Sequence, residues 1–251
     1  MLPGRWIFSL AIVALGAENI VRAHDVRSIP ALPFLPPVPW LAILFGTLWI
    51  ACGLGLLVQR WLRASAYTLG ATYIFWTLVH VVPQYIAQPG DMGLRTIVFE
   101  PLSLACIALL LPGESVTPKW LAVACRIVIA VAMIVFGVDH YLGIVFIASL
   151  IPNWIPWHIS WVALFGAVFI ACGLEIGMGI GSGIFARWSW AAIGVMFAVW
   201  VIALHLPRVL GLYGIPGAPR NPDEWSSLFI AVGLWGGPWA MAGGLRNRSP
   251  V

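Results

Sequence analysis

The sequence predicts an all-α integral membrane protein with eight transmembrane helices, arranged as two parallel four-helix repeats. Hydrophobic residues make up 61% of the 251 residues and charged residues only 9%, whereas soluble domains carry about 25% charged residues. The apolar residues form runs of about 20, the length that crosses a bilayer as a helix. In addition, the run FGTLWIACGL at 45–54 returns as FGAVFIACGL at 165–174. This recurrence predicts the repeat.

The first half contains four apolar runs that charges, prolines or glycines interrupt. The first run follows Arg5, and the second begins at Pro39. The third opens after Arg63 and ends at Pro83, and the fourth follows Arg95. The predicted helices are 5–23, 39–58, 64–83 and 96–111.

The second half repeats this arrangement. Its first run begins at Lys119, its second follows His158 and its third opens after Arg187 and ends near Pro207. The last run follows Glu224. The predicted helices are 119–141, 159–178, 188–206 and 225–243.

The internal repeat covers most of the chain. LGAEN at 15–19 aligns with FGVDH at 136–140, in the first helix of each half. Because each half has an even number of crossings, both halves enter the membrane from the same side, which gives parallel repeats. The predicted domains are residues 1–112 and 120–251, joined by the loop at 113–119. In the third helices an offset of 124 relates Arg63, Gly70, Trp76 and Pro83 to Arg187, Gly194, Trp200 and Pro207.

The Lys and Arg residues favour one orientation, because cytoplasmic loops carry an excess of them. Seven lie on one side of the predicted topology: Arg5, Arg60, Arg63, Lys119, Arg187, Arg246 and Arg248. Five lie on the other: Arg22, Arg27, Arg95, Arg208 and Arg220. We expect an inner-membrane protein with both termini in the cytoplasm. The net charge of +4 is too dispersed to indicate nucleic-acid binding.

This topology places most ionisable residues of the helices near the outer face. Ionisable groups within a bilayer are costly, so they usually face a bundle interior or a cavity and mark function. Glu175 is the exception, near the inner end of its helix, and His24 lies in the first outer loop. The sequence therefore predicts one polar layer that could bind a ligand. Its candidate residues are Glu18, His80, Glu100, Asp139, His140, His158, His205 and Arg208.

The same residues also have a structural interpretation. Glu18 and Arg22 are one helical turn apart and can form an ion pair. The others can satisfy backbone groups at helix ends or beside prolines, or can lie at the membrane interface. Those residues are Asp139, His140, His80, His205 and His158.

Two outer connections are apolar and rich in proline: SIPALPFLPPVPW at 28–40 and IVFIASLIPNWIPW at 144–157. They are too interrupted to span, so we expect re-entrant or interface-lying segments that cover each half on its outer side. Aromatic and apolar walls with a few polar groups suit a flat amphiphile that enters from lipid.

The four cysteines fall inside predicted helices without a C-x-x-C motif, and we interpret them as small packing residues. The sequence has no H-x-x-x-H, H-x-H or H-E-x-x-H spacing and no G-x-S-x-G element. It therefore predicts neither a metal site nor a hydrolase. The cysteines are Cys52, Cys106, Cys125 and Cys172.

One order of motifs is common to both halves. G-x-[ED]-[NH] in the first helix precedes a proline-rich segment ending in P-W and then L-F-G-x-x-x-I-A-C-G-L. An arginine opens the third helix and a histidine near a proline closes it. This order resembles the DoxX-like family of small four-helix membrane proteins, here as a tandem duplication. The resemblance implies a four-helix bundle per half and a membrane oxidoreductase subunit, since named members include a quinone-reducing thiosulfate dehydrogenase.

Three functions remain open. In a quinone-linked oxidoreductase subunit, His80, His205 and Arg208 would donate hydrogen bonds to the quinone, while carboxyl groups exchange protons. In a b-type cytochrome, His80 and His205 would be the axial ligands of haem. In a non-catalytic subunit of a complex with other membrane or periplasmic proteins, the polar layer would only fix helix packing. The proton-exchanging carboxyl groups of the first function would be Glu18, Glu100 and Asp139.

Overall fold

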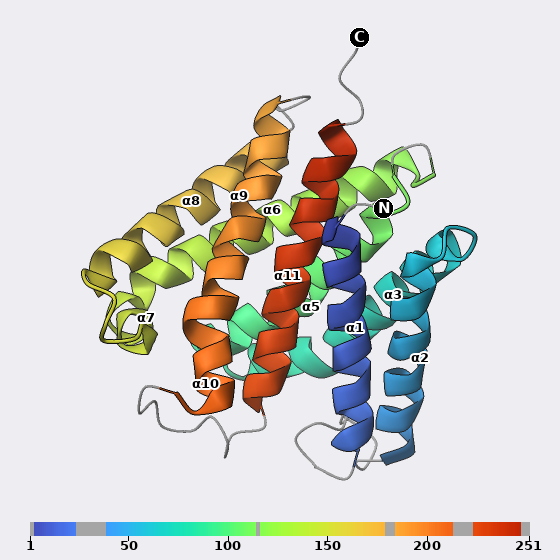
Figure 1. The fold of residues 1–251 in the computed structure, drawn as a ribbon, viewed down its shortest axis with the longest axis horizontal. Coiled ribbons are helices and arrows are strands. Elements are labelled where there is room, and N and C mark those ends of the chain that lie inside the picture. The colour runs from blue at the N-terminus through green and yellow to red at the C-terminus, as the bar shows by residue number, and fades with distance from the viewer. Residues whose placement is uncertain (1–2, 24–38, 114–115, 179–183, 213–222, 247–251) are drawn as a thin grey trace.

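The computed structural model describes residues 3–23, 39–113, 116–178, 184–212 and 223–246. These residues form helices and no strand, which confirms the predicted all-α class. The first half contains α1 (Pro3–Val21), α2 (Pro39–Leu57), α3 (Leu62–Trp76), the π-helical segment η1 (Thr77–Val81), α4 (Val82–Ala87) and α5 (Met92–Leu110). The second contains α6 (Lys119–Leu142), α7 (Ile144–Leu150), α8 (His158–Met178), α9 (Ile184–Trp200), η2 (Val201–His205), α10 (Leu206–Leu210) and α11 (Asp223–Arg246), as labelled in Figure 1.

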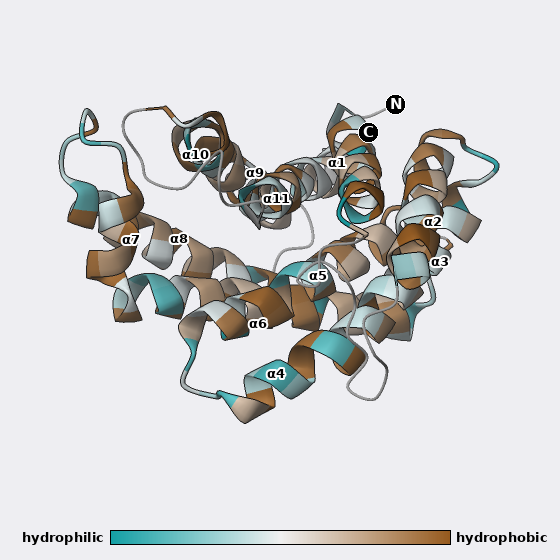
Figure 2. Ribbon diagram, turned by 90° about the horizontal axis from the view of Figure 1, so that it is seen from below, coloured by the Kyte–Doolittle hydropathy of each residue, from teal (hydrophilic) through white to brown (hydrophobic). Residues whose placement is uncertain are grey.

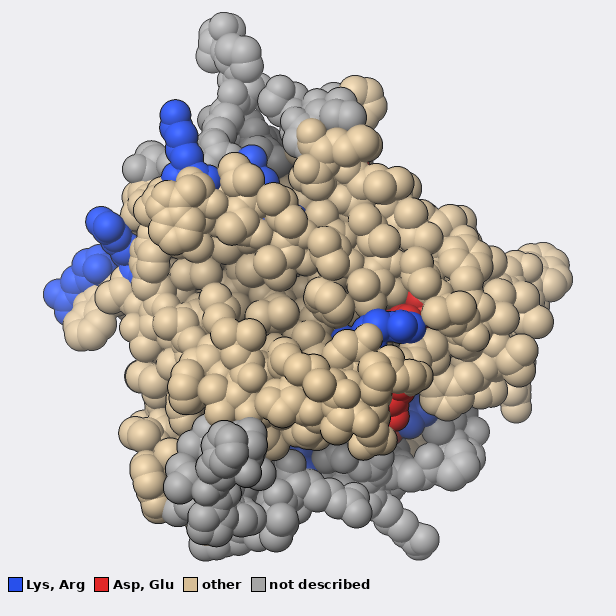
Figure 3. Space-filling model, turned by 180° about the vertical axis from the view of Figure 1, so that it is seen from behind, with Lys and Arg blue, Asp and Glu red and all other residues tan. Residues whose placement is uncertain are grey.

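Six helical stretches of the described chain are long and apolar enough to cross a membrane. Within the described residues, α11 is not one of them. Figure 3 shows a broad face of the molecule with very few charged side chains. The chain is therefore a multi-pass protein surrounded by lipid. The six stretches are α1, α2, α5, α6, α8 and Phe185–Leu210.

The third helix of each half continues through its proline, whereas the sequence predicted that it would end there. Pro83 lies at the start of α4 and Pro207 at the start of α10, each directly after a π-helical segment. Proline lacks the amide hydrogen of a regular helical turn, and its ring collides with the preceding turn. The wider π-turn relieves this conflict without ending the helix. The two turns, η1 and η2, occupy matching positions 124 residues apart.

The long helices pack in a closed ring. Each long helix contacts the next one along the chain, and the last, α11, contacts the first, α1. The order of the ring is α1, α2, α3, α5, α6, α8, α9 and α11. Figure 2 shows this circuit from below, and α5 also contacts α11 across it. As a result the last helix of each predicted half packs against the first helix of the other half. The halves form one body.

Glycines allow the first two helices of each half to touch through their backbones. A Cβ atom added to Gly16 in α1 would lie 2.5 Å from the carbonyl oxygen of Gly46 in α2. A Cβ atom added to Gly137 in α6 would lie 2.6 Å from the carbonyl oxygen of Gly166 in α8. Small residues permit such close approach between membrane helices. The recurring sequence motif thus corresponds to the same contact in both halves.

The proline-rich connection at 144–157 contains the short helix α7, followed by a turn that leads into α8. Trp157 in this turn has a φ of 58° and is 77% exposed. Positive φ is uncommon for a bulky residue. Of the connection predicted at 28–40, residues 28–38 lie outside the part of the chain that the structure describes.

Candidate functional site

The buried carboxylate of Asp139 joins α6 to α5. Asp139 is only 4% exposed, and both of its oxygens accept hydrogen bonds from the Arg95 guanidinium, which also forms an ion pair with it. The hydroxyl of Thr96 donates a further hydrogen bond to it at 3.3 Å. A buried charge requires such a partner, because water no longer solvates it. The pair therefore holds the C-terminal end of α6 against the start of α5.

A matching cluster joins α1 to α11. The hydroxyl of Ser226 donates a hydrogen bond of 2.6 Å to Glu18. The Arg22 guanidinium lies 2.9 Å from the same carboxylate, as expected for residues one turn apart. Glu18 and Asp139 align in the sequence repeat. Each therefore links the first helix of one predicted half to the last helix of the other.

A third buried carboxylate, Glu224, pairs with Arg208 at the junction of α10 and α11. The Arg208 Nε atom donates to it at 2.9 Å, and a second guanidinium nitrogen completes a two-point contact. Bidentate pairs of this kind are strong and fix geometry. The guanidinium predicted to bind a quinone thus already has a carboxylate partner. His205 lies on the same segment, and its Nδ1 atom is buried without a hydrogen-bond partner in the described chain.

The imidazole of His140 lies within aromatic side chains between α6, α8 and α9. Its ring centroid is 5.4 Å from that of Phe169 and 5.7 Å from that of Trp200. Its Nδ1 atom lies 2.7 Å from the carbonyl oxygen of Phe136, so Nδ1 carries the hydrogen in this contact. The Nε2 atom is buried and has no partner among the described residues. In the neutral ring, Nε2 is an unused acceptor.

The first half has the same aromatic positions, but the histidine that contacts them, His80, lies in η1 and not at the repeat position of His140. The ring centroids of Phe45 and Trp76 are 5.8 Å apart, and those of Phe165 and Trp200 are 5.9 Å apart. Asn19 occupies the repeat position of His140. Two similar aromatic clusters therefore differ in the group that could bind a ligand.

Other predicted site residues lie apart from His140. Ring centroids of His80 and Trp76 are 4.9 Å apart, and the Gln84 amide lies 3.2 Å from the His80 ring. Figure 2 shows α4 and α10 on opposite sides of α5 and α6. His80 directly precedes α4 and His205 directly precedes α10, so this arrangement does not favour a haem between them.

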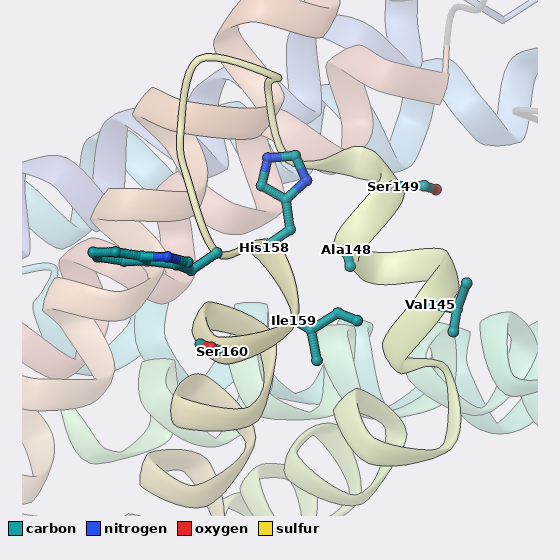
Figure 4. A pocket seen from close by; sticks show the side chains of 7 residues that line it. Val145, Ala148, Ser149, His158, Ile159 and Ser160 are labelled. Atoms are coloured by element: carbon teal, nitrogen blue, oxygen red, sulfur yellow. The ribbon is translucent and has the colours of Figure 1, made fainter.

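His158 borders an open groove of about 490 Å³ between α7 and the start of α8. Figure 4 shows its side chain together with Ser149 and Ile159 around this groove. Glu100 is half-buried in α5, directly before Pro101.

The sequence interpretation missed three partners, Arg95, Ser226 and Glu224. Arg95 was counted only for orientation, and Glu224 only as the boundary of a helix. Arg208 and Glu224 have opposite charges and lie at neighbouring helix ends on the same side of the predicted topology. This signal could have suggested that they pair.

The cysteines are free thiols, and all four are buried. This burial agrees with their interpretation as packing residues. Among the described residues no group of His, Cys, Asp and Glu side chains could hold a metal ion.

Comparison with known protein families, with curated proteins and with solved structures gave no match to this chain.

Proposed function

We propose that the protein is a DoxX-like subunit of a quinone-linked membrane oxidoreductase and binds a quinol beside His140. In this proposal eight helices span the inner membrane as two parallel four-helix repeats, with both termini in the cytoplasm. The motif order of the sequence supports the family. The matching glycine contacts and the matching positions of Glu18 and Asp139 support the repeat.

The buried, unused Nε2 atom of His140 carries the proposal. A buried polar atom without a partner is costly, so it usually has a functional or ligand-dependent explanation. Here it is surrounded by aromatic rings, which provide apolar and stacking surface for a planar ligand. Phe165 and Trp200 are only partly buried, so this aromatic cluster is reachable from the lipid side.

The tautomer indicates which form of the ligand fits. Because Nδ1 donates to the Phe136 carbonyl, neutral His140 can accept a hydrogen bond through Nε2. A quinol hydroxyl supplies this hydrogen, whereas a quinone carbonyl oxygen does not. Oxidation of the quinol releases two electrons and two protons. One proton moves from the hydroxyl that contacts His140 to Nε2, and the other leaves from the opposite hydroxyl to water. The electrons must pass to a redox partner, which is why we assign the chain as a subunit.

The test measures binding of decylubiquinol to the purified protein in detergent, through quenching of tryptophan fluorescence. We expect His140→Ala to weaken binding at least tenfold, because it removes the acceptor. Asn19→Ala, at the repeat position in the first half, is the matched control and should bind as the wild type does. The His80→Ala/His205→Ala double variant should also retain binding. Loss of binding in that double variant together with normal binding in His140→Ala would refute the assignment.

A non-catalytic role in a larger membrane complex is the second candidate. It is favoured by the finding that Glu18, Asp139 and Glu224 each have a partner on a neighbouring helix or helical segment. Such contacts are what helix packing alone requires. This role predicts that His140→Ala leaves co-purification with partner subunits and the activity of the complex unchanged.

A further inference from the structure

Three arginines gather around the turn between α2 and α3, at the end of the molecule opposite the polar clusters. Arg60 and Arg63 lie in or next to this turn and are exposed. Arg5, at the start of α1, donates to the carbonyl oxygen of Leu57 at 3.0 Å and to the side chain of Gln59 at 3.2 Å. These hydrogen bonds hold the third guanidinium at the same turn. We call Arg5, Arg60 and Arg63 the basic corner.

Within the described residues, no carboxylate compensates the charge of the basic corner. The ion pairs of the described chain involve other arginines, and none of these three pairs with a carboxylate. The Nε atom of Arg5 is buried and has no hydrogen-bond partner in the described part of the chain. On the face drawn in Figure 3, Lys and Arg side chains gather at the upper left, with no Asp or Glu drawn among them. The corner therefore offers positive charge.

Aromatic side chains accompany these cations. Trp6, next to Arg5, is 46% exposed, and Trp61, next to Arg60, is 53% exposed. The Arg60 guanidinium lies 5.5 Å from the centre of the Trp61 ring. Tryptophan and tyrosine prefer the membrane interface, where one part of the side chain contacts lipid and another contacts water. The basic corner thus lies at headgroup depth.

We propose that the basic corner binds the phosphate of an anionic phospholipid from the leaflet that it faces. Two exposed guanidiniums supply charge-assisted hydrogen bonds to the phosphate oxygens. The tryptophans contact the glycerol region and the upper acyl chains. Charge complementarity selects an anionic headgroup, because a zwitterionic headgroup would bring its own cation next to the arginines. This binding is independent of the ligand proposed at His140.

Native mass spectrometry of the protein in detergent, titrated with phosphatidylglycerol or phosphatidylcholine, tests the proposal. We expect the first phosphatidylglycerol to bind at least tenfold more tightly than phosphatidylcholine. Arg60→Gln/Arg63→Gln should weaken phosphatidylglycerol binding by about 25-fold, since about 1 kcal/mol per arginine corresponds to about fivefold each. Arg187→Gln is the matched control, because Arg187 is the repeat counterpart of Arg63 and also lies near a tryptophan ring.

Two further measurements on the wild type do not depend on the folding of a variant. About 1 M salt should abolish the preference for phosphatidylglycerol, because screening weakens exposed charges. Inorganic phosphate at the lipid concentration should leave lipid binding unchanged. The proposal is wrong if the two lipids bind equally, if the double variant binds like the wild type, or if inorganic phosphate displaces the lipid.

Discussion

Replacing Arg95 with methionine should destabilise the protein more than any change of an exposed charge. The substitution leaves the carboxylate of Asp139, whose side chain is 6% exposed, with only the hydroxyl of Thr96 at 3.3 Å. Removing one partner of a buried ion pair costs about 3–5 kcal/mol, because the remaining charge is neither solvated nor compensated. At about 2–4 °C per kcal/mol for a chain of this size, the unfolding temperature should fall by roughly 6–20 °C.

Thermal unfolding in one detergent, followed by circular dichroism, provides the measurement. The double variant Arg95→Met/Asp139→Leu removes both charges and should recover most of the lost stability, since apolar pairs often replace buried ion pairs without cost. Lys119→Met changes an exposed residue and should alter the free energy of unfolding by less than about 0.5 kcal/mol. If Arg95→Met unfolds at the wild-type temperature, or if the double variant is as unstable as the single one, the buried-pair reasoning is refuted.

Two other predictions concern packing. Gly137→Ala and Gly16→Ala should each destabilise the protein by about 1–3 kcal/mol, because the new methyl group meets the carbonyl oxygen of the neighbouring helix. Gly244→Ala is the control, since nothing lies within 4 Å of the new atom. Equal unfolding temperatures for all three variants would contradict the prediction. The four cysteines are at most 6% exposed. A maleimide should therefore modify none of them within minutes in the folded protein and all four in dodecyl sulfate, as measured by intact-mass spectrometry. Rapid modification before denaturation would contradict their burial.

Much of the fold follows from local pattern. Apolar run length predicted where the long helices lie, because it depends on residues near each other in the chain. The recurring motif predicted the repeat but not that α1 and α2, or α6 and α8, touch through their glycines. The π-turns before Pro83 and Pro207 were not predicted, since a proline in sequence signals a helix end as readily as a widened turn. The sequence also contained no signal that α5 and α11 pack on the first helix of the opposite half.

The candidate site was predicted in part for the same reason. His140 and Asp139 were candidates because ionisable residues are rare in apolar helices. Their partners come from other helices, so Arg95 and the aromatic rings near His140 could not be assigned from spacing along α6. The unused Nε2 atom of His140 depends on the orientation of one ring in three dimensions, which no sequence pattern specifies.

The contact between α11 and α1 gives the molecule a property unlike that of a bundle with free ends. Because the first and last helices are neighbours, the covalent connection at 113–119 is only one of several places where the polypeptide could be interrupted. A circularly permuted gene that joins the present termini through a flexible linker and begins near residue 116 would encode the same set of helix neighbours. The same helix packing could then form whichever half of the chain is translated first.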